Sequence, residues 1–466
     1  MTSSHWPRRL LVIALLATAA ALGVWAFQPR HETSEAIGGP TLATPLWSAR
    51  RTPELIREDI GARRLAYGLG LAVADVDACV LVDDERTRRV TIGDDKELIP
   101  ASATKILTGS GLLAALGADH TFTTTVNATA PPDGSGAVGD LWLVGGGDPV
   151  LSTADYRAFL AEDPSRVDDP TTSLEELADA VVAAGVRHVD TLHGDDTRQD
   201  TARTVDGWDP TYPDQGVIGP LSALTVNDGY VEWGSLNVGA PDPAAYAADE
   251  LAQLLEDRGV SVDATTGTDA SPGDSESLAA VDSAPLGDLV GAMIRSSDNQ
   301  TAEVLTRELG ANAGEGTTAH GLEASAAALD DLGIDERRSL SDGSGLNREN
   351  HVACDAFIDA LRSSETGAVR EGLAVAGESG TLAERFRGTP LEGRLHAKTG
   401  YLNGVTALTG ILDTEQGRPL TFAFLGNGGF DRAGAYQLQS DVATAIAAYP
   451  DVAPAEALVP APLPPA

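Results

Sequence analysis

The feature that most constrains this chain is the stretch Ile99–Leu107, which reads I-P-A-S-A-T-K-I-L. Pro100 suits the first position of a helix, and the apolar spacing from Ile106 onward predicts a buried helical face. Ser102 and Lys105 lie three positions apart and therefore share one side of the first turn. A lysine can activate a serine when burial or a nearby cation lowers its pKa. The stretch predicts a nucleophile at a helix start, where free N–H groups face developing negative charge.

Lysine usage makes this interpretation specific. A Ser-x-x-Lys pattern arises by chance about once in a chain of this length, so an exposed helix start is the simpler alternative. The chain has 32 basic residues, of which only Lys96, Lys105 and Lys398 are lysines. Arginine supplies the remaining charge and does not lose its proton in proteins. A lysine kept in such a chain indicates a need for an amine that can be deprotonated.

Composition restricts the class of protein. At 466 residues with 42% hydrophobic residues, the chain is expected to form two or more domains. A net charge of −37 argues against nucleic acid as a partner. Metal-binding motifs such as Cys-x-x-Cys and His-Glu-x-x-His are absent from the sequence, so we expect no metal and no cofactor. The two cysteines, Cys79 and Cys354, fit one bridge or two buried thiols equally well.

The N-terminus indicates export. An arginine pair at positions 8 and 9 precedes the apolar run Leu10–Phe27, which as a helix would measure about 27 Å. Residues 1–27 are therefore predicted to be a signal or an uncleaved anchor, and both remain open. We expect contact with a membrane only through this segment. Residues 28–55 read as a linker, and residues 451–466 read as a Pro/Ala-rich tail.

Hydrophobic periodicity places the other elements. Strands are expected at 65–82, 122–126, 141–144, 405–412 and 420–425, and helices at 174–184, 244–255 and 437–449.

Three short patterns follow one another along the chain: Ser102-x-x-Lys105, Ser297-Asp298-Asn299 and Lys398-Thr399-Gly400. This set occurs in β-lactamases and penicillin-binding proteins. Each pattern alone has an ordinary structural explanation as a turn or a strand end. Two of the three lysines in the chain fall on the two pattern lysines, so together they are far more specific.

The first part of the set performs the chemistry. Ser102 would attack an amide carbonyl and Lys105 would accept its proton, while Ser297 relays a proton to the leaving nitrogen. A positive charge on Lys398 would help to keep Lys105 neutral.

The second part binds substrate. Asn299 would contact the substrate backbone, and Lys398 with Thr399 would hold a terminal carboxylate. Gly400 allows the substrate to lie along the strand edge. The backbone N–H groups of Ser102 and Tyr401 would form an oxyanion hole.

The spacing of the patterns distinguishes among relatives. Ser102 and Ser297 are 195 positions apart (297 − 102), whereas a compact fold of this kind needs about 60, so most of the interval must be an inserted domain. The chain resembles the D-alanyl-D-alanine carboxypeptidases of the class C low-molecular-mass penicillin-binding protein type. Besides the three patterns, the resemblance rests on the segments 143–149, 221–227, 302–303, 342–348 and 380–382.

That resemblance implies an α/β (α+β) fold. The catalytic domain (56–120 and 281–450) would be a five-stranded antiparallel sheet flanked by helices, and a β-rich domain (121–280) would be inserted. The substrate would be the D-Ala-D-Ala end of peptidoglycan stem peptides, with β-lactams as covalent inhibitors; some relatives also cut cross-links. Asp196 and Arg348 would line a side pocket for the stem. Asn347 departs from the family pattern, which usually has serine there.

Two alternatives remain. A β-lactamase would need fast deacylation, for which the sequence offers no clear additional base. A wall-binding scaffold with an inactive site would have no need for Lys105 and Lys398. In every case we expect the protein to act outside the cytoplasm or at the outer face of the membrane.

Overall fold

The structure is a computed structural model that describes residues 52–84, 87–415 and 417–449. The predicted signal or anchor, most of the predicted linker and the predicted tail lie outside the described residues. Within those residues, no helix combines the length and apolar character needed to cross a membrane. The fold below belongs to one compact unit that begins at Leu55.

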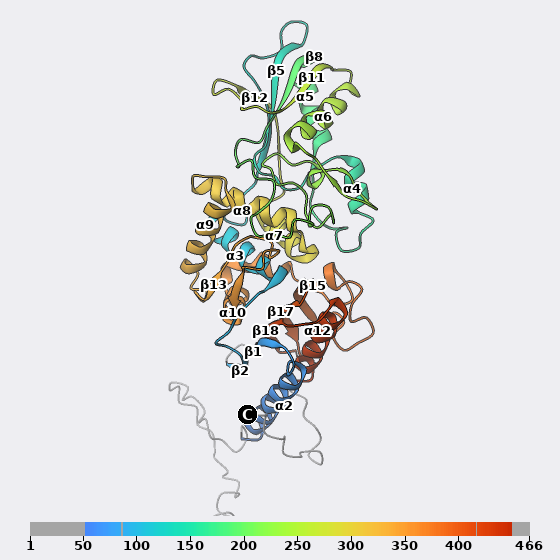
Figure 1. Ribbon diagram of the computed structural model, residues 1–466. Helices are drawn as coiled ribbons and strands as arrows, with labels where there is room; N and C mark the ends of the chain where they lie inside the picture. The colour runs from blue at the N-terminus through green and yellow to red at the C-terminus, as the bar shows by residue number, and fades with distance from the viewer. Residues whose placement is uncertain (1–51, 85–86, 416, 450–466) are drawn as a thin grey trace, which may run out of the picture. The chain divides into compact units, whose positions relative to one another are not determined.

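The larger sheet runs in the order β15-β16-β17-β18-β1-β2 with every neighbouring pair antiparallel (Figure 1). Its strands are β1 (Asp77–Asp83), β2 (Arg88–Ile92), β15 (Ala374–Val375), β16 (Leu395–Leu402), β17 (Val405–Asp413) and β18 (Pro419–Asn427). The resemblance implied five strands. The sixth is β15, a two-residue strand that pairs with the start of β16.

Side chains of this sheet alternate between two cores. In β1, Ala78, Val80 and Val82 pack on one side, and Cys79 and Leu81 pack on the other. The first side is covered by α2 (Thr52–Ala72) and α12 (Arg432–Ala447), which lie beside each other. Period-two burial on both faces is expected for a sheet with a layer of helices on each side.

The second side is covered by a group of helices that includes those carrying Lys105, Ser297 and Asn299. These are α3 (Thr104–Leu116), α7 (Leu286–Ala292), η3 (Met293–Ser297), α8 (Asn299–Ala313), α9 (Thr318–Asp331), α10 (Cys354–Arg362) and α11 (Gly367–Glu371). Short elements complete this part: β3 (Glu97–Leu98), η1 (Ala101–Ala103), β13 (Arg338–Ser339), β14 (His351–Ala353), η4 (Ser364–Thr366) and η5 (Gly380–Leu382). Helix α3 is buried all round from Thr104 to Leu113, not on one face as its spacing predicted.

The predicted strand at 65–82 is wrong over its first half. Residues up to Ala72 belong to helix α2, and only β1 is extended. Leu65 and Leu69 are four positions apart and pack against Val442 and Ile446 of α12, which is helical spacing.

A second sheet is formed between positions 123 and 282. It runs in the order β11-β8-β5-β4-β12, with β5 and β11 both parallel to β8. Its strands are β4 (Thr123–Ala128), β5 (Ala137–Val144), β8 (His188–Asp195), β11 (Ser261–Thr268) and β12 (Glu276–Asp282). The other elements here are α4 (Ala154–Leu160), α5 (Leu174–Ala183), α6 (Pro243–Glu256), β6 (Leu151–Ser152), β7 (Thr172–Ser173), η2 (Asn227–Gly229), β9 (Tyr230–Glu232) and β10 (Val238–Gly239).

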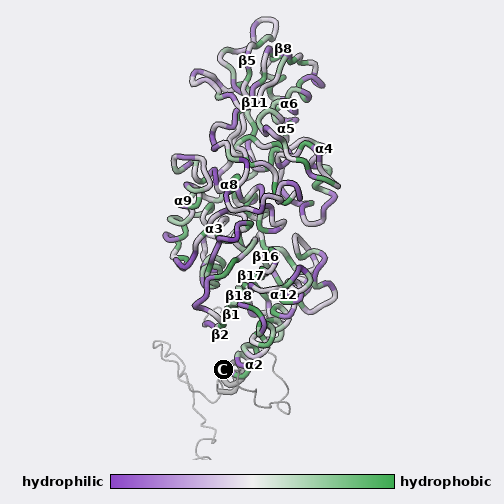
Figure 2. The backbone as a smooth tube through the Cα atoms, viewed as in Figure 1, coloured by the Kyte–Doolittle hydropathy of each residue, from purple (hydrophilic) through white to green (hydrophobic). Residues whose placement is uncertain are grey.

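This second region is mixed α/β, whereas the resemblance implied a β-rich insert. Helices α5 and α6 pack on its sheet and share one core with it. The chain enters this sheet on β4 and leaves on β12, and these two strands pair with Thr123 opposite Asp282. Hydrophobic and hydrophilic segments alternate along the chain in both regions (Figure 2).

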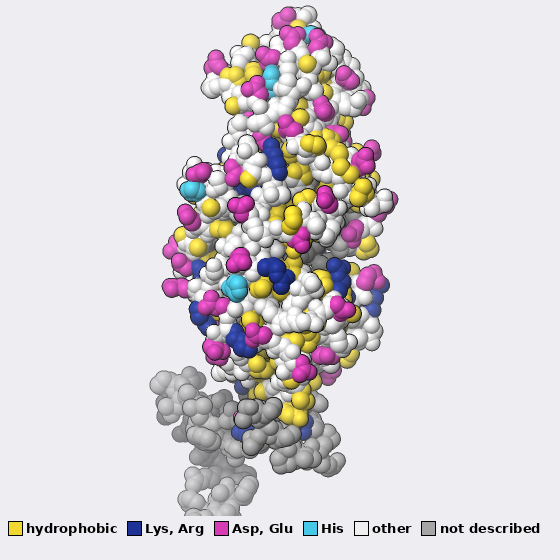
Figure 3. Space-filling view, in the orientation of Figure 1, with side chains coloured by type: hydrophobic (Ala, Val, Ile, Leu, Met, Phe, Trp, Pro, Cys, Tyr) yellow, Lys and Arg dark blue, Asp and Glu magenta, His cyan; other side chains and the backbone are white. Residues whose placement is uncertain are grey.

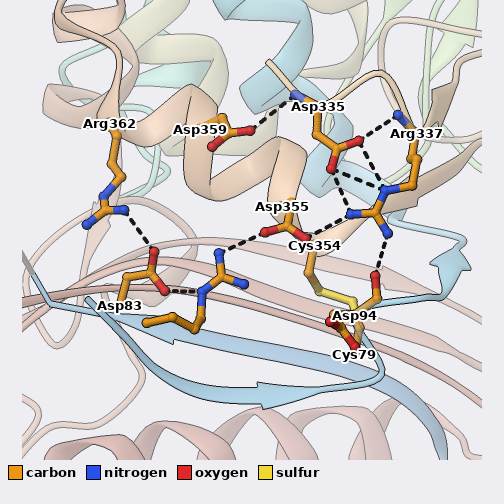
Figure 4. Close-up of polar contacts among 10 residues, drawn as sticks. Cys79, Asp83, Asp94, Asp335, Arg337, Cys354, Asp355, Asp359 and Arg362 are labelled. Atoms are coloured by element: carbon orange, nitrogen blue, oxygen red, sulfur yellow. Dashed lines mark hydrogen bonds and ion pairs between the residues drawn. A yellow bond between two sulfur atoms is a disulfide. The ribbon is translucent and has the colours of Figure 1, made fainter. Parts of the chain in front are cut away.

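A disulfide joins Cys79 of β1 to Cys354 of α10, with the two Cα atoms 6.3 Å apart. Of the two alternatives left by the sequence, the structure therefore contains the bridge. Figure 4 shows that charged side chains from β1, α10 and the loop before β13 surround it. Acidic side chains are spread over the face of the molecule shown in Figure 3, as the net charge leads one to expect.

Candidate active site

Ser102 and Lys105 lie together at the start of α3. Ser102 is partly exposed in the 3₁₀ turn η1, and Lys105 is fully buried one turn later. The loop at 342–348 holds this turn from one side. Gly345 (φ 86°) approaches so closely that a Cβ there would lie 2.0 Å from the carbonyl oxygen of Ala101. Only glycine fits such a contact, so the backbone of η1 is fixed by tertiary packing.

The amine of Lys105 has three neighbours. Its Nζ lies 2.7 Å from Asn299 Oδ1, 2.7 Å from the carbonyl oxygen of Ser344, and 3.3 Å from Ser102 Oγ. The first two atoms can only accept hydrogen bonds. A neutral amine that donates its two N–H groups to them has its lone pair left for the hydroxyl of Ser102. The surroundings of Lys105 therefore orient it as a base.

The electrostatics support the same role. Burial lowers the pKa of Lys105 to about 8, although the carboxylates of Asp342, Glu303 and Asp298 act in the opposite direction. Loss of solvent is the larger effect because the side chain has no exposed surface. A fraction of Lys105 is thus neutral near neutral pH.

Ser297 and Lys398 form a second pair. Lys398 on β16 is fully buried and donates from Nζ to Ser297 Oγ at 2.8 Å and to its neighbour's carbonyl, Thr399 O, at 2.7 Å. Ser297 ends the π-helical turn η3 and has φ 66°, an uncommon conformation for a residue with a side chain. Strained backbone of this kind is often found at functional sites.

The surroundings of Lys398 do not favour the positive charge that the sequence led us to expect. The sequence predicted a charged amine here, but neither of its partners is a carboxylate. Burial, and then the positive charge of Lys105, lower the pKa of Lys398 well below its ordinary value. In the free protein the surroundings of Lys398 therefore oppose the charge, and an anion beside it would favour the charge.

Strand β16 offers a free edge next to these residues. Strand β15 pairs only with His396 and Ala397, so the strand edge from Thr399 onward has no neighbouring strand among the described residues. Thr399 Oγ1 lies 3.0 Å from Thr381 Oγ1. A Cβ at Gly400 would lie 2.8 Å from the carbonyl oxygen of Pro100, so glycine lets β16 pass close to the turn that carries Ser102. Tyr401 is partly exposed, with its ring 4.9 Å from the guanidinium of Arg432.

Asn299 connects Lys105 to a distant loop. Its Oδ1 accepts from Lys105, and its Nδ2 donates to the carbonyl oxygen of Val217 at 2.9 Å. Val217 belongs to the long loop between β8 and β9, so a residue far away in sequence reaches the centre. Sequence patterns gave no signal for it, because a backbone carbonyl has no residue preference.

Among the described residues, the two predicted side-pocket residues form no hydrogen bond or ion pair with Ser102, Lys105, Ser297 or Lys398. Asp196 is 2% exposed, and its carboxylate is bound by Ser222 (2.8 Å), Thr268 (2.7 Å) and Arg203 (2.8 Å). These contacts favour a structural role over contact with a substrate. Arg348 is exposed and donates to the carbonyl oxygen of Asn403, in the turn between β16 and β17. Arg348 therefore lies beside the turn that follows β16.

Two buried acids near Lys105 were not predicted as site residues. Asp342 accepts hydrogen bonds from Trp208 Nε1, from the side chain of Asn350 and from backbone N–H groups of its own loop. Glu303 on α8 accepts from the Ser344 N–H at 2.7 Å, and burial raises its pKa to about 7. Together they fix the loop whose carbonyl holds Lys105. Their signals were the segments 342–348 for Asp342 and 302–303 for Glu303, which the sequence marked only as family patterns.

One group of described side chains is close enough to share a metal ion. His188, Asp190 and Asp263 lie on β8 and β11 of the second sheet, with His188 Nε2 3.0 Å from Asp190 Oδ1. Both aspartates are exposed, and exposed acids often cluster without an ion. None of the predicted catalytic residues belongs to this group.

Comparison with known proteins identifies the family. The model of the D-Ala-D-Ala carboxypeptidase 3 (S13) family matches residues 77–237 and 234–449. The chain belongs to this family. It is 34% identical over 465 residues to a D-alanyl-D-alanine carboxypeptidase of Actinomadura sp. (strain R39), covering 82% of each chain. It is 31% identical over 449 residues to the carboxypeptidase DacB of Mycolicibacterium smegmatis, covering 90% of each.

Solved structures agree on the fold. The structure of penicillin-binding protein 4 from Haemophilus influenzae matches with a TM-score of 0.68 at 21% identity, over 81% of this chain and 98% of that one. The same protein has also been solved in complex with a β-lactam. The predicted family, the predicted penicillin-binding fold and the predicted class of enzyme, a serine-type D-Ala-D-Ala carboxypeptidase, are therefore confirmed.

Proposed function

We propose that this S13 enzyme removes the terminal D-alanine from peptidoglycan stem peptides through an ester on Ser102. The observation that carries the proposal is the environment of Lys105, where two obligate acceptors leave the amine lone pair to the Ser102 hydroxyl. We further propose that 56–120 and 281–450 form the catalytic domain, that 121–280 are inserted into it, and that the enzyme works after export.

Acylation follows from the contacts. Ser102 Oγ attacks the carbonyl carbon of the penultimate D-alanine while its proton moves to Lys105 Nζ. The carbonyl oxygen becomes negative and is stabilised by the N–H groups of Ser102 and Tyr401. The C–N bond then breaks as Ser297 Oγ gives a proton to the leaving nitrogen and takes one from the ammonium of Lys398. Lys105 keeps the proton of Ser102 until the ester is hydrolysed. Water later hydrolyses the ester and regenerates Ser102.

Substrate charge completes the site. The carboxylate of the terminal D-alanine would lie between Lys398 and Thr399, at the free edge of β16. Its negative charge raises the pKa of Lys398 and so favours the ammonium form when substrate is bound. A positive charge on Lys398 in turn favours the neutral form of Lys105. β-Lactams carry a carboxylate too and would use the same contact.

The direct test is labelling with a fluorescent penicillin followed by mass spectrometry of the peptides. We expect one adduct on Ser102 in the wild type and none in Ser102→Ala. Absence of label on the wild type, where a known penicillin-binding protein is labelled, would contradict the proposal. The lifetime of the adduct separates the alternatives, since a β-lactamase would release it quickly and turn over a chromogenic cephalosporin.

A further inference from the structure

A segment of the second region contacts the turn that carries Ser297. Residues 161–171 connect α4 to β7, and two ion pairs run from them to this turn. Arg166 Nη2 lies 2.6 Å from Asp298 Oδ2, and Asp169 Oδ1 lies 2.8 Å from Arg295 Nη2. Arg295 also donates to the carbonyl oxygen of Asp168 at 3.1 Å. The turn is thus held on both sides of Ser297 by one segment.

Arg166 is surrounded by acids. Besides Asp298, its guanidinium lies 3.4 Å from Asp228 Oδ2 and 3.5 Å from Asp169 Oδ2, and its side chain is only 22% exposed. Asp228 also accepts from Tyr156 of α4 at 2.8 Å. Without the guanidinium, three carboxylates would face one another with little solvent between them, and their mutual repulsion would push them apart.

Asp298 transmits this restraint to the site. One of its oxygens, Oδ1, caps α8 by accepting from the Thr301 N–H at 3.1 Å, and the other is the atom that Arg166 holds. The residue before it, Ser297, has the strained backbone described above, and the residue after it, Asn299, binds Lys105. A shift of Asp298 would therefore move the hydroxyl of Ser297 and the amide of Asn299 together.

We propose that Arg166 is a positioning residue, through which the inserted region fixes the Ser297-Asp298-Asn299 turn in its reactive geometry. This inference rests on the proposed function, because it assigns the turn a part in catalysis. Arg166 touches no predicted substrate group. Its effect would pass through the turn, chiefly through Asp298, so it should alter the rate of the chemical steps more than the binding of substrate.

The chain offers a matched control on the same helix. At the far end of α8, Arg198 of the second region lies 2.6 Å from Glu308, which is itself fully buried. We would compare Arg166→Met with Arg198→Met, measuring kcat and KM for a D-Ala-D-Ala peptide, the acylation rate with a penicillin, and the melting temperature. Both variants lose an ion pair between the second region and α8, but only Arg166→Met releases the turn.

We expect Arg166→Met to lower kcat and the acylation rate about 10- to 100-fold with little change in KM, because small displacements of reacting groups have effects of this size. Arg198→Met should keep kcat within about twofold while losing similar stability. Adding Asp228→Asn to Arg166→Met should restore part of the rate, since it removes one of the repelling carboxylates.

Two results would overturn the inference: a kcat of Arg166→Met within twofold of wild type, or equal losses in both arginine variants. If Arg166→Met does not fold, Asp298→Asn tests the same role. Its amide oxygen can still accept from the Thr301 N–H, but the variant loses the ion pair with Arg166. It should then show the loss of kcat, and an unchanged kcat would refute the role. A wild type that is never acylated would refute the proposed function instead, before any variant is compared.

Discussion

Two clusters of charged side chains lie at opposite edges of the larger sheet. They differ in whether each charge is paired with an opposite charge. At the β1–β2 edge, Asp83 is 3% exposed and binds both Arg88 and Arg362, the latter at 2.8 Å. Asp355 of α10 joins Arg88 (2.7 Å) to Arg337 (2.8 Å) in the same network (Figure 4). Every one of these charges has an opposite charge beside it.

At the β16 edge neither lysine has a carboxylate in direct contact among the residues that the structure describes. Lys105 and Lys398 are bound by carbonyl, amide and hydroxyl oxygens, and burial lowers the pKa of both. The carboxylates nearest Lys105 act at longer range. A buried charge that is paired with an opposite charge keeps that charge. A buried amine without such a partner has a lowered pKa and can lose its proton.

Removing the amine of Lys105 should cause the largest loss of acylation. Lys105→Met keeps the length of the side chain but has no lone pair for the Ser102 proton. We expect acylation by penicillin to fall about 10³-fold or more, as for loss of a general base. Stopped-flow acylation rates measure this. Lys105→Arg, which cannot be deprotonated, should lose as much, and near-wild-type activity in it would contradict the role of Lys105 as the base.

Replacing Lys398 should show that it binds the substrate carboxylate, whereas Lys105 acts as the base. Lys398→Met removes the partner of the substrate carboxylate, so kcat/KM for a D-Ala-D-Ala peptide should fall about 10²-fold, a loss typical of an unpaired charged group. A peptide ending in a carboxamide lacks that charge and should lose much less. An equal loss for both peptides would contradict carboxylate binding by Lys398.

Breaking the disulfide tests whether the β1–β2 edge of the sheet contributes to stability but not to catalysis. Cys79→Ala together with Cys354→Ala should lower the free energy of unfolding by about 2–4 kcal/mol, because the bridge no longer restricts the unfolded chain. The acylation rate at 25 °C should stay unchanged. Denaturant unfolding and penicillin labelling give the two numbers. A loss of labelling in folded protein would show that the two edges are coupled.

The smallest effect is expected from the paired charges. Asp83→Asn leaves Arg88 and Arg362 without their carboxylate and should cost about 1–3 kcal/mol of stability. Arg63→Gln removes an exposed pair with Asp59 and should cost less than about 1 kcal/mol. Thermal unfolding compares the two variants, and both should acylate normally. A change in the acylation rate of Asp83→Asn would contradict the view of this edge as purely structural.

The sequence was sufficient for the centre of the site. The predicted residues form two hydrogen-bonded groups, Ser102 with Lys105 and Asn299, and Ser297 with Lys398. Their patterns are readable because each depends on side-chain chemistry at short spacing. The helices 174–184 and 244–255 were also predicted closely, since their apolar faces keep a clear helical period.

Other features depend on contacts between distant segments and could not be read in this way. The carbonyl of Val217 and the guanidinium of Arg166 reach the site from loops without any motif. The segment at 65–82 contains both a helix and a strand, and its apolar residues fit either period over a few positions. Asp196 follows a family pattern, but its local partners bury it.

The most direct test of the account is the pH dependence of Ser102 acylation by a penicillin in the wild type. The rate is expected to rise as Lys105 loses its proton and to level off above an apparent pKa of about 8. A rate that keeps rising through pH 10, as for a lysine with its ordinary pKa of 10.5, would contradict it.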